Sequence, residues 1–149
     1  MLPNIRNLRE ISRRCQTGQP LDPDLASWLG TSLEKFLEQR CHSVDEALGL
    51  RFAQGGVPWW REEAIRLRDD ALRALAARIA PDGSTAAKAK SVYRLALRYA
   101  ASAWRFDRER HAMPATYHGT ANELLWRAFK SGAVMPLGER QLRTVLAGA

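Results

Sequence analysis

The chain has 149 residues, of which 46% are hydrophobic and 26% are charged. This length suits one domain, and the apolar fraction excludes wholesale disorder and a fibrous class. No apolar run approaches the roughly 18 residues that cross a bilayer, and the arginine-rich N-terminus lacks the apolar run of a secretory signal. Two cysteines, Cys15 and Cys41, are too few for a disulfide framework, and we expect both to be small buried side chains. We therefore expect a reduced, cytoplasmic protein without a membrane role.

Basic residues outnumber acidic ones, 23 against 16, which gives a formal net charge of +7. Nineteen of the basic residues are arginine, which binds phosphates and carboxylates through two N–H groups at once. A GC-rich genome would also raise the arginine and alanine contents together, and both interpretations stay open. Residues 81–149 hold 11 basic and five acidic residues, so nearly all of the excess lies in this last part of the chain.

Helical periodicity runs along the whole sequence, and no segment alternates with the period of a strand. The spacing predicts helices over residues 4–15, from 22 or 24 to about 40, then 43–48, 58–79, 85–110, 120–131 and 138–147. Prolines and capping residues stand where several of these helices begin. We expect an all-α fold: a compact bundle of six to seven helices in a single domain, residues 1–149. Residues 1–18 are a candidate for a loosely attached N-terminal helix.

The long helix predicted over residues 85–110 has a cationic face. At 100° per residue, five basic side chains fall within an arc of about 80°. These side chains are Lys90, Arg94, Arg98, Arg105 and Arg108. The apolar side chains of this helix, up to Phe106, fall on the opposite arc and are expected in the core. Nucleic-acid phosphates would offset the repulsion between the cations. The alternative is neutralisation by acids of other helices, such as Glu34, Glu38, Asp45 and Glu46.

The last two predicted helices, 120–131 and 138–147, are joined by a glycine-containing turn, as in a helix-turn-helix. The second helix would expose Arg140, Gln141 and Arg143, whose side-chain types bind base edges in DNA grooves. The connection of about six residues is longer than the usual turn of this motif. Ordinary packing of two bundle helices is therefore the competing interpretation.

Three tryptophans are candidates for contacts outside the core, although Trp60 also continues the apolar line of its helix. Trp59 and Trp60 begin one helix and point about 100° apart, and Trp126 lies beside the apolar line of another. An exposed tryptophan suits a partner contact or stacking on a base, whereas a half-exposed one often seals the rim of a small core. We take Trp59, Trp60 and Trp126 as candidate partner-binding residues.

Signals for catalysis and for metal binding are weak. His42, His111 and His118 lack the spacing of metal ligands, and no glycine-rich phosphate loop or paired-carboxylate motif is present. The sequence therefore predicts no metal, no cofactor and no enzymatic activity. A site assembled from distant residues would leave no trace in the sequence, so the question of an enzyme stays open.

The leading hypothesis is a small nucleic-acid-binding protein, regulatory or accessory in role. Its long helix would contact phosphates and its last helix would contact bases, with DNA favoured over RNA. The alternative is a helical module that binds an acidic protein partner or forms a homodimer through its tryptophans. Charge reversal at Arg94 and Arg98 discriminates the two, because only nucleic-acid binding would be lost.

Overall fold

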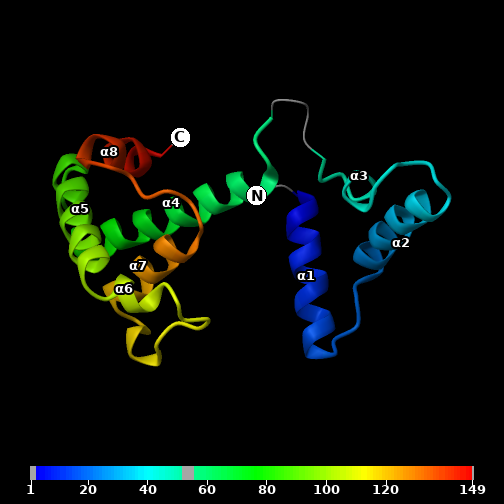
Figure 1. Ribbon diagram of the computed structural model, residues 1–149, viewed down its shortest axis with the longest axis horizontal. Coiled ribbons are helices and arrows are strands. Elements are labelled where there is room, and N and C mark those ends of the chain that lie inside the picture. Colours follow the sequence, from blue (N-terminus) through cyan, green and yellow to red (C-terminus); the bar gives the residue numbers. More distant parts are fainter. Residues whose placement is uncertain (1–2, 52–55, 149) are drawn as a thin grey trace. The chain divides into compact units, whose positions relative to one another are not determined.

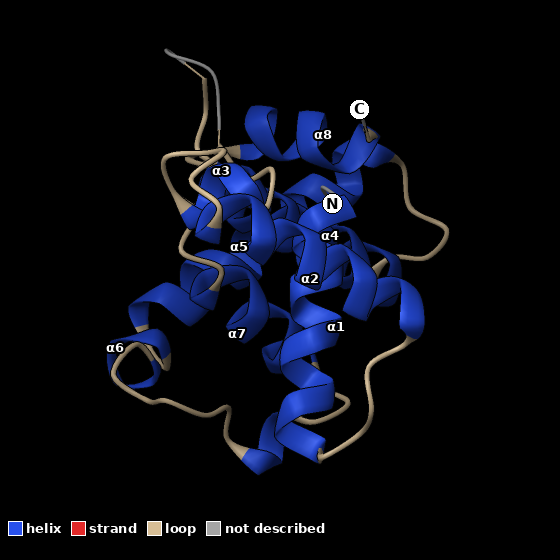
Figure 2. Cartoon of the chain, turned by 90° about the vertical axis from the view of Figure 1, so that its right-hand side faces the viewer, coloured by secondary structure: helices blue, strands red, loops and turns tan. Residues whose placement is uncertain are grey.

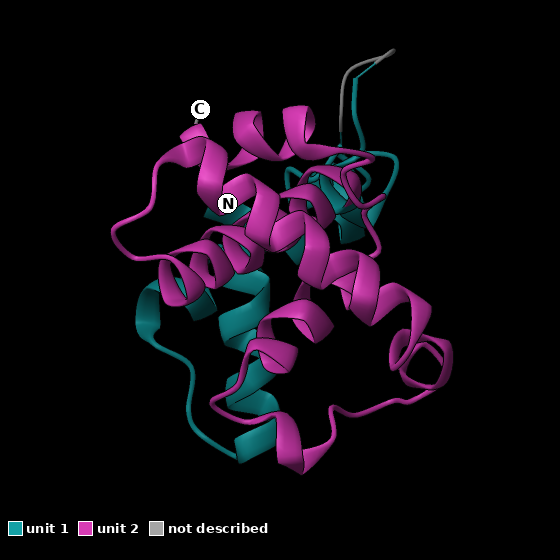
Figure 3. Ribbon diagram, turned by 90° about the vertical axis from the view of Figure 1, so that its left-hand side faces the viewer, with its two compact units in different colours: residues 1–60 teal, residues 61–149 magenta. Residues whose placement is uncertain are grey.

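The computed structural model describes residues 3–51 and 56–148 (Figure 1). Within these ranges the chain forms eight α-helices and one 3₁₀ helix, and no strand (Figure 2). The predicted all-α class is confirmed. No helix in the same ranges combines the length and the apolar character that a membrane span needs. The chain divides into two compact units, residues 1–60 and 61–149 (Figure 3), and the single-domain assignment stays a prediction.

The first unit contains α1 (Pro3–Thr17), α2 (Pro23–Leu37) and α3 (Val44–Ala47). Ser43 caps α3 by accepting a hydrogen bond from the backbone N–H of Glu46, as its sequence pattern predicts. Few side chains of this unit are buried. Cys15 is exposed and Cys41 is half-buried, so the prediction that both are buried is wrong. Cys15 lies in the last turn of α1, beyond Ile11, where the buried stripe of that helix has ended.

The second unit is built from six helices around one core. They are α4 (Trp59–Ile79), α5 (Thr85–Ala101), α6 (Trp104–Asp107), η1 (Ala115–Tyr117), α7 (Ala121–Lys130) and α8 (Glu139–Ala147). Fully buried side chains come from four of them: Leu72, Leu75, Val92, Leu125 and Leu142. Burying each such side chain contributes about 1.5–3 kcal/mol. α8 packs against α5, and Leu142 is the side chain that it buries there.

The predicted single helix over residues 85–110 is wrong. α5 ends at Ala101, Ser102 leaves helical geometry with φ −117° and ψ −94°, and the short α6 follows. The break brings Asp107 inside, where it accepts a hydrogen bond from the hydroxyl of Tyr99. In an unbroken helix these two residues would be separated by about 12 Å along the axis, too far for that bond. The long-range contact therefore determines where α5 ends.

Candidate nucleic-acid interface

The excess positive charge belongs entirely to the second unit. Residues 61–149 contain 16 basic and nine acidic side chains, whereas residues 1–60 contain seven of each. On α4 several charges of opposite sign are paired: Arg66 contacts Glu63 and Asp70 at 2.7 Å. Arg68 contacts Asp69 at the same distance. The unit's net charge is therefore concentrated on the helices that follow α4.

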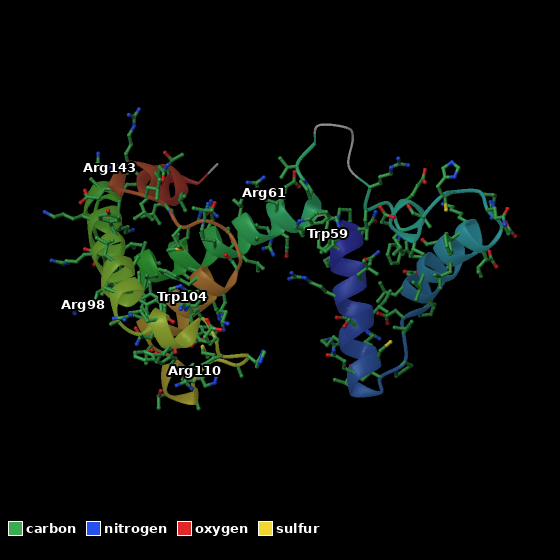
Figure 4. All side chains as sticks on the ribbon, viewed as in Figure 1. Trp59, Arg61, Arg98, Trp104, Arg110 and Arg143 are labelled. Atoms are coloured by element: carbon green, nitrogen blue, oxygen red, sulfur yellow. The ribbon has the colours of Figure 1, made fainter. Side chains whose placement is uncertain are left out.

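Three of the predicted cations form one exposed face of α5. Lys90, Arg94 and Arg98 follow one another at four-residue spacing, and each side chain is exposed. None of the three forms an ion pair with any acid of the described residues. Figure 4 shows Arg98 pointing outward from its helix. The like charges on this face are thus left without neutralising partners within the chain as described.

Two of the acids expected to neutralise this face are engaged elsewhere. Glu38 forms an ion pair with Arg40 at 2.6 Å, and Glu46 forms one with Arg51 at 3.3 Å. Both pairs lie inside the first unit, which is electrically neutral as a whole. Glu34 and Asp45 form no ion pair in the described residues, so neutralisation by acids of the first unit stays a prediction.

Arg105 and Arg108 do not continue the α5 face. Both are exposed, but they follow the break at Ser102, so the predicted arc of five cations on one helix is wrong. Arg108 also contacts Glu109 at 3.2 Å. Both side chains of that pair are largely exposed, and such a pair contributes little to stability. The two arginines form a separate basic turn that follows α5 in the chain.

α8 adds further cations. Arg140 and Arg143 are exposed on either side of the buried Leu142, and neither forms an ion pair within the described chain. Figure 4 shows Arg143 directed away from the unit. Gln141 is exposed too, but its Oε1 accepts a hydrogen bond of 2.7 Å from the backbone N–H of Leu137. The amide of Gln141 thus stabilises the start of α8, which leaves the two arginines as its free polar groups for a ligand.

The packing of α8 bears on the predicted helix-turn-helix. Its main neighbour is α5, and the structure shows no comparable packing between α7 and α8 (Figure 1). A recognition helix would instead be supported by the helix before it in the chain. The arrangement therefore does not support a helix-turn-helix, and it shows instead that the two helices with unpaired exposed cations, α5 and α8, pack on each other.

The tryptophans divide into exposed and buried ones. Trp60 is 55% exposed and Trp59 is half-buried, and their rings meet edge to face with centroids 5.8 Å apart. Trp126 is only 7% exposed, and Nζ of Lys130 lies 5.0 Å from its ring centroid. Trp126 is thus a core residue, and its assignment as an exposed partner contact is wrong. Its ring lies in the wall of a cavity between α4 and α7, with the Lys130 ammonium over it.

Phe106 was expected in the core and is 72% exposed. The same short helix turns Trp104 inward, where its ring lies 5.2 Å from that of Phe129. Residues two apart on a helix point about 200° apart, so Trp104 and Phe106 cannot both face the core. The break at Ser102 determines which of the two faces inward, and no glycine or proline in the sequence marks that break.

Two further kinds of site are a cluster of metal ligands and a ligand-binding cavity. Across residues 3–51 and 56–148, no three His, Cys, Asp or Glu side chains gather as metal ligands. A cavity of about 380 Å³ lies between α4 and α7, with Leu67, Leu124 and Trp126 in its wall. Its charged groups are already paired: Asp70 contacts Arg66, and Arg127 contacts Glu123. None of these groups is left to orient a ligand.

Comparison with known proteins gives no match: no protein-family model, no curated protein and no solved structure is similar to this chain. The interpretation of the site therefore depends on its own charges and contacts. The strongest feature is the set of exposed cations on the two packed helices α5 and α8.

Proposed function

We propose that the second unit binds nucleic acid through a basic surface formed by Lys90, Arg94, Arg98, Arg140 and Arg143. The observation that supports it is that these five cations are exposed and lack acidic partners in the described residues, while three arginines of α4 in the same unit, Arg66, Arg68 and Arg73, form ion pairs. A nucleic-acid backbone offers closely spaced phosphates and releases counterions when cations replace them. Arginine is suited to this contact because its planar fork binds two phosphate oxygens.

The proposed role is accessory or regulatory, in the cytoplasm, and without catalysis. DNA is the favoured nucleic acid. Arg105 and Arg108 would extend the phosphate contacts beyond the end of α5. Arg140 and Arg143 are the residues of α8 that could reach bases.

The test is fluorescence anisotropy of labelled DNA and RNA with the full chain. We expect submicromolar binding at about 50 mM salt. Five phosphate contacts predict a loss of affinity of about 100- to 500-fold at 200 mM salt. The double variant Arg94→Glu/Arg98→Glu should lose binding by at least about tenfold, since it replaces two phosphate contacts by repulsion.

The matched control reverses two other exposed arginines, in Arg6→Glu/Arg61→Glu (Figure 4 shows Arg61). This variant has the same net charge as the first but keeps the basic surface. Its affinity should stay within about threefold of the original chain, because separated charges are screened at these salt concentrations. Equal losses in both variants, or no binding at low salt, would contradict the proposal.

A second candidate function is association with protein, and α2 favours it. Among the residues of α2 only Ser32 is buried, while Leu33 is 40%, Phe36 is 37% and Leu37 is 75% exposed. Exposed apolar patches of this kind mark protein contacts. Light scattering tests the homodimer directly: the chain mass is 16.8 kDa, and a mass of twice that value would favour this candidate.

A further inference from the structure

The exposed ring of Phe106 lies between two exposed arginines of the second unit. Its neighbour Arg105 is exposed, and so is Arg108 two residues later. The ring has no place in the core, because Trp104 fills that position against Tyr99 and Phe129. An exposed aromatic ring among cations needs an explanation that phosphate binding alone does not supply.

A second exposed apolar side chain lies within the α5 face itself. Leu97 is 53% exposed and directly precedes Arg98. At 100° per residue it falls about 20° from Lys90 and about 60° from Arg94, at the edge of the row of cations. Two exposed apolar side chains, Leu97 and Phe106, therefore accompany the exposed cations of α5 and α6.

This combination of exposed cations and exposed apolar side chains distinguishes single-stranded from duplex nucleic acid as the ligand. A duplex presents phosphates outward and hides the faces of its bases in the stack. A single strand presents phosphates together with base faces, which stack on aromatic side chains. A surface for duplex phosphates would gain nothing from the exposed ring of Phe106, whereas a surface for a single strand would use it.

We propose that the ligand of the second unit is single-stranded nucleic acid, with Arg94, Arg98 and Arg105 on its phosphates and Phe106 stacked on an unpaired base. This inference rests on the proposed function, because the cations of α5 supply the phosphate contacts. It adds the form of the nucleic acid and the residue that distinguishes this form.

The experiment compares three fluorescein-labelled probes with the full chain at about 50 mM salt. The probes are a 20-nucleotide DNA strand of mixed sequence, the RNA strand of the same sequence, and the DNA duplex. We expect a single strand to bind more tightly than the duplex. Phe106→Ala should weaken single-strand binding about tenfold and leave duplex binding within about twofold.

Two further variants and a salt series isolate stacking. Phe106→Tyr keeps an aromatic ring and should keep the affinity, and Val134→Ala removes a similarly exposed apolar group outside the basic surface and should leave the affinity unchanged. The slope of log affinity against log salt should be unchanged in Phe106→Ala, because no phosphate contact is lost. In Arg94→Glu/Arg98→Glu that slope should become less steep, because two phosphate contacts are lost.

The outcomes separate the inference from the proposed function. If Phe106→Ala binds the strand as well as the original chain does, or if the duplex binds as tightly as the strand, the proposal that Phe106 stacks on an unpaired base is wrong. The proposed function then stands as long as Arg94→Glu/Arg98→Glu abolishes binding. If poly-glutamate displaces the strand at equal charge concentration, the surface binds anions without regard to bases, and the inference fails. If none of the three probes binds, both proposals fail together.

Discussion

The hydroxyl of Tyr99 donates a hydrogen bond of 2.7 Å to Oδ2 of Asp107, a residue that is only 3% exposed. The hydroxyl of Tyr117 donates to the same oxygen at 2.9 Å, and Arg110 forms an ion pair with Oδ1 at 3.4 Å. One carboxylate thus joins α5, α6 and η1. Because it fixes the corner between α5 and α6, it also sets where Phe106 lies relative to the cations of α5.

Removing this carboxylate should destabilise the second unit. Asp107→Ala deletes two hydrogen bonds to a charged acceptor and leaves the buried hydroxyl of Tyr99 without a partner, at a cost of about 3 kcal/mol. Urea unfolding followed by circular dichroism measures the change. Glu109→Ala is the control, since that side chain is 79% exposed and its ion pair with Arg108 contributes little. Similar losses in the two variants would show that the network does not stabilise the corner.

The same network should raise the pH at which Tyr99 and Tyr117 ionise. Burial, followed by the hydrogen bond to Asp107, raises the pKa of Tyr99 and the pKa of Tyr117. A raised pKa means that the folded chain holds these protons more tightly. The resulting stabilisation is complete below the ordinary tyrosine pKa of about 10 and is lost as the pH rises beyond it.

Absorbance at about 295 nm measures this ionisation. Of the three tyrosines in the chain, two should ionise only at higher pH or together with unfolding. Tyr99→Phe should remove one of the delayed ionisations. A single step near pH 10 for all three tyrosines, with helix content unchanged, would contradict the prediction.

Local signals in the sequence predicted the helices well but missed the break in one of them. Ser84, for example, accepts a hydrogen bond of 3.2 Å from the backbone N–H of Ala87, as a helix-capping serine should. The break at Ser102 has no such local signal. It depends on Tyr99, Asp107 and Tyr117, which come together only when three elements pack, and periodicity carries no information about that packing.

Part of the candidate interface could also be predicted from the sequence. The residue types and the helical face of Lys90, Arg94 and Arg98 follow from spacing alone. The sequence could not show which charges pair, nor that Gln141 is engaged by the backbone of Leu137. The exposure of Phe106 depends on tertiary contacts, because it follows from the direction that α6 takes after the break.

In the first unit, Glu10 should give α1 a stability that depends on pH. Its carboxylate accepts hydrogen bonds from Arg13 at 2.6 Å and from Arg14 at 2.7 Å. These bonds lower the pKa of Glu10 from 4.5 to about 2. A lowered pKa in the folded state gives a stabilisation that is present above pH 4.5 and is lost as the pH falls towards 2.

Glu10→Gln tests this expectation. The variant should unfold at a lower urea concentration than the original chain at neutral pH, and the difference should shrink between pH 4.5 and 2. The difference should be small, because the carboxylate is exposed to water. Glu34→Gln is the control, an exposed change on α2 outside any ion pair of the described residues. A difference that does not vary with pH would contradict the assignment.

Arg140 and Arg143 should contact phosphates, as proposed for the cations of α5, because α8 packs on α5 and both arginines are exposed. Replacing either by glutamine should lower the salt slope of log affinity by about 0.7 for a single strand or 0.9 for a duplex. The loss of affinity should be the same for probes of different sequence, since phosphates carry no sequence information. Anisotropy titrations between about 50 and 200 mM salt measure both quantities, with Arg61→Gln as a control that should change neither. An unchanged slope together with a loss confined to certain sequences would instead assign that arginine to a base.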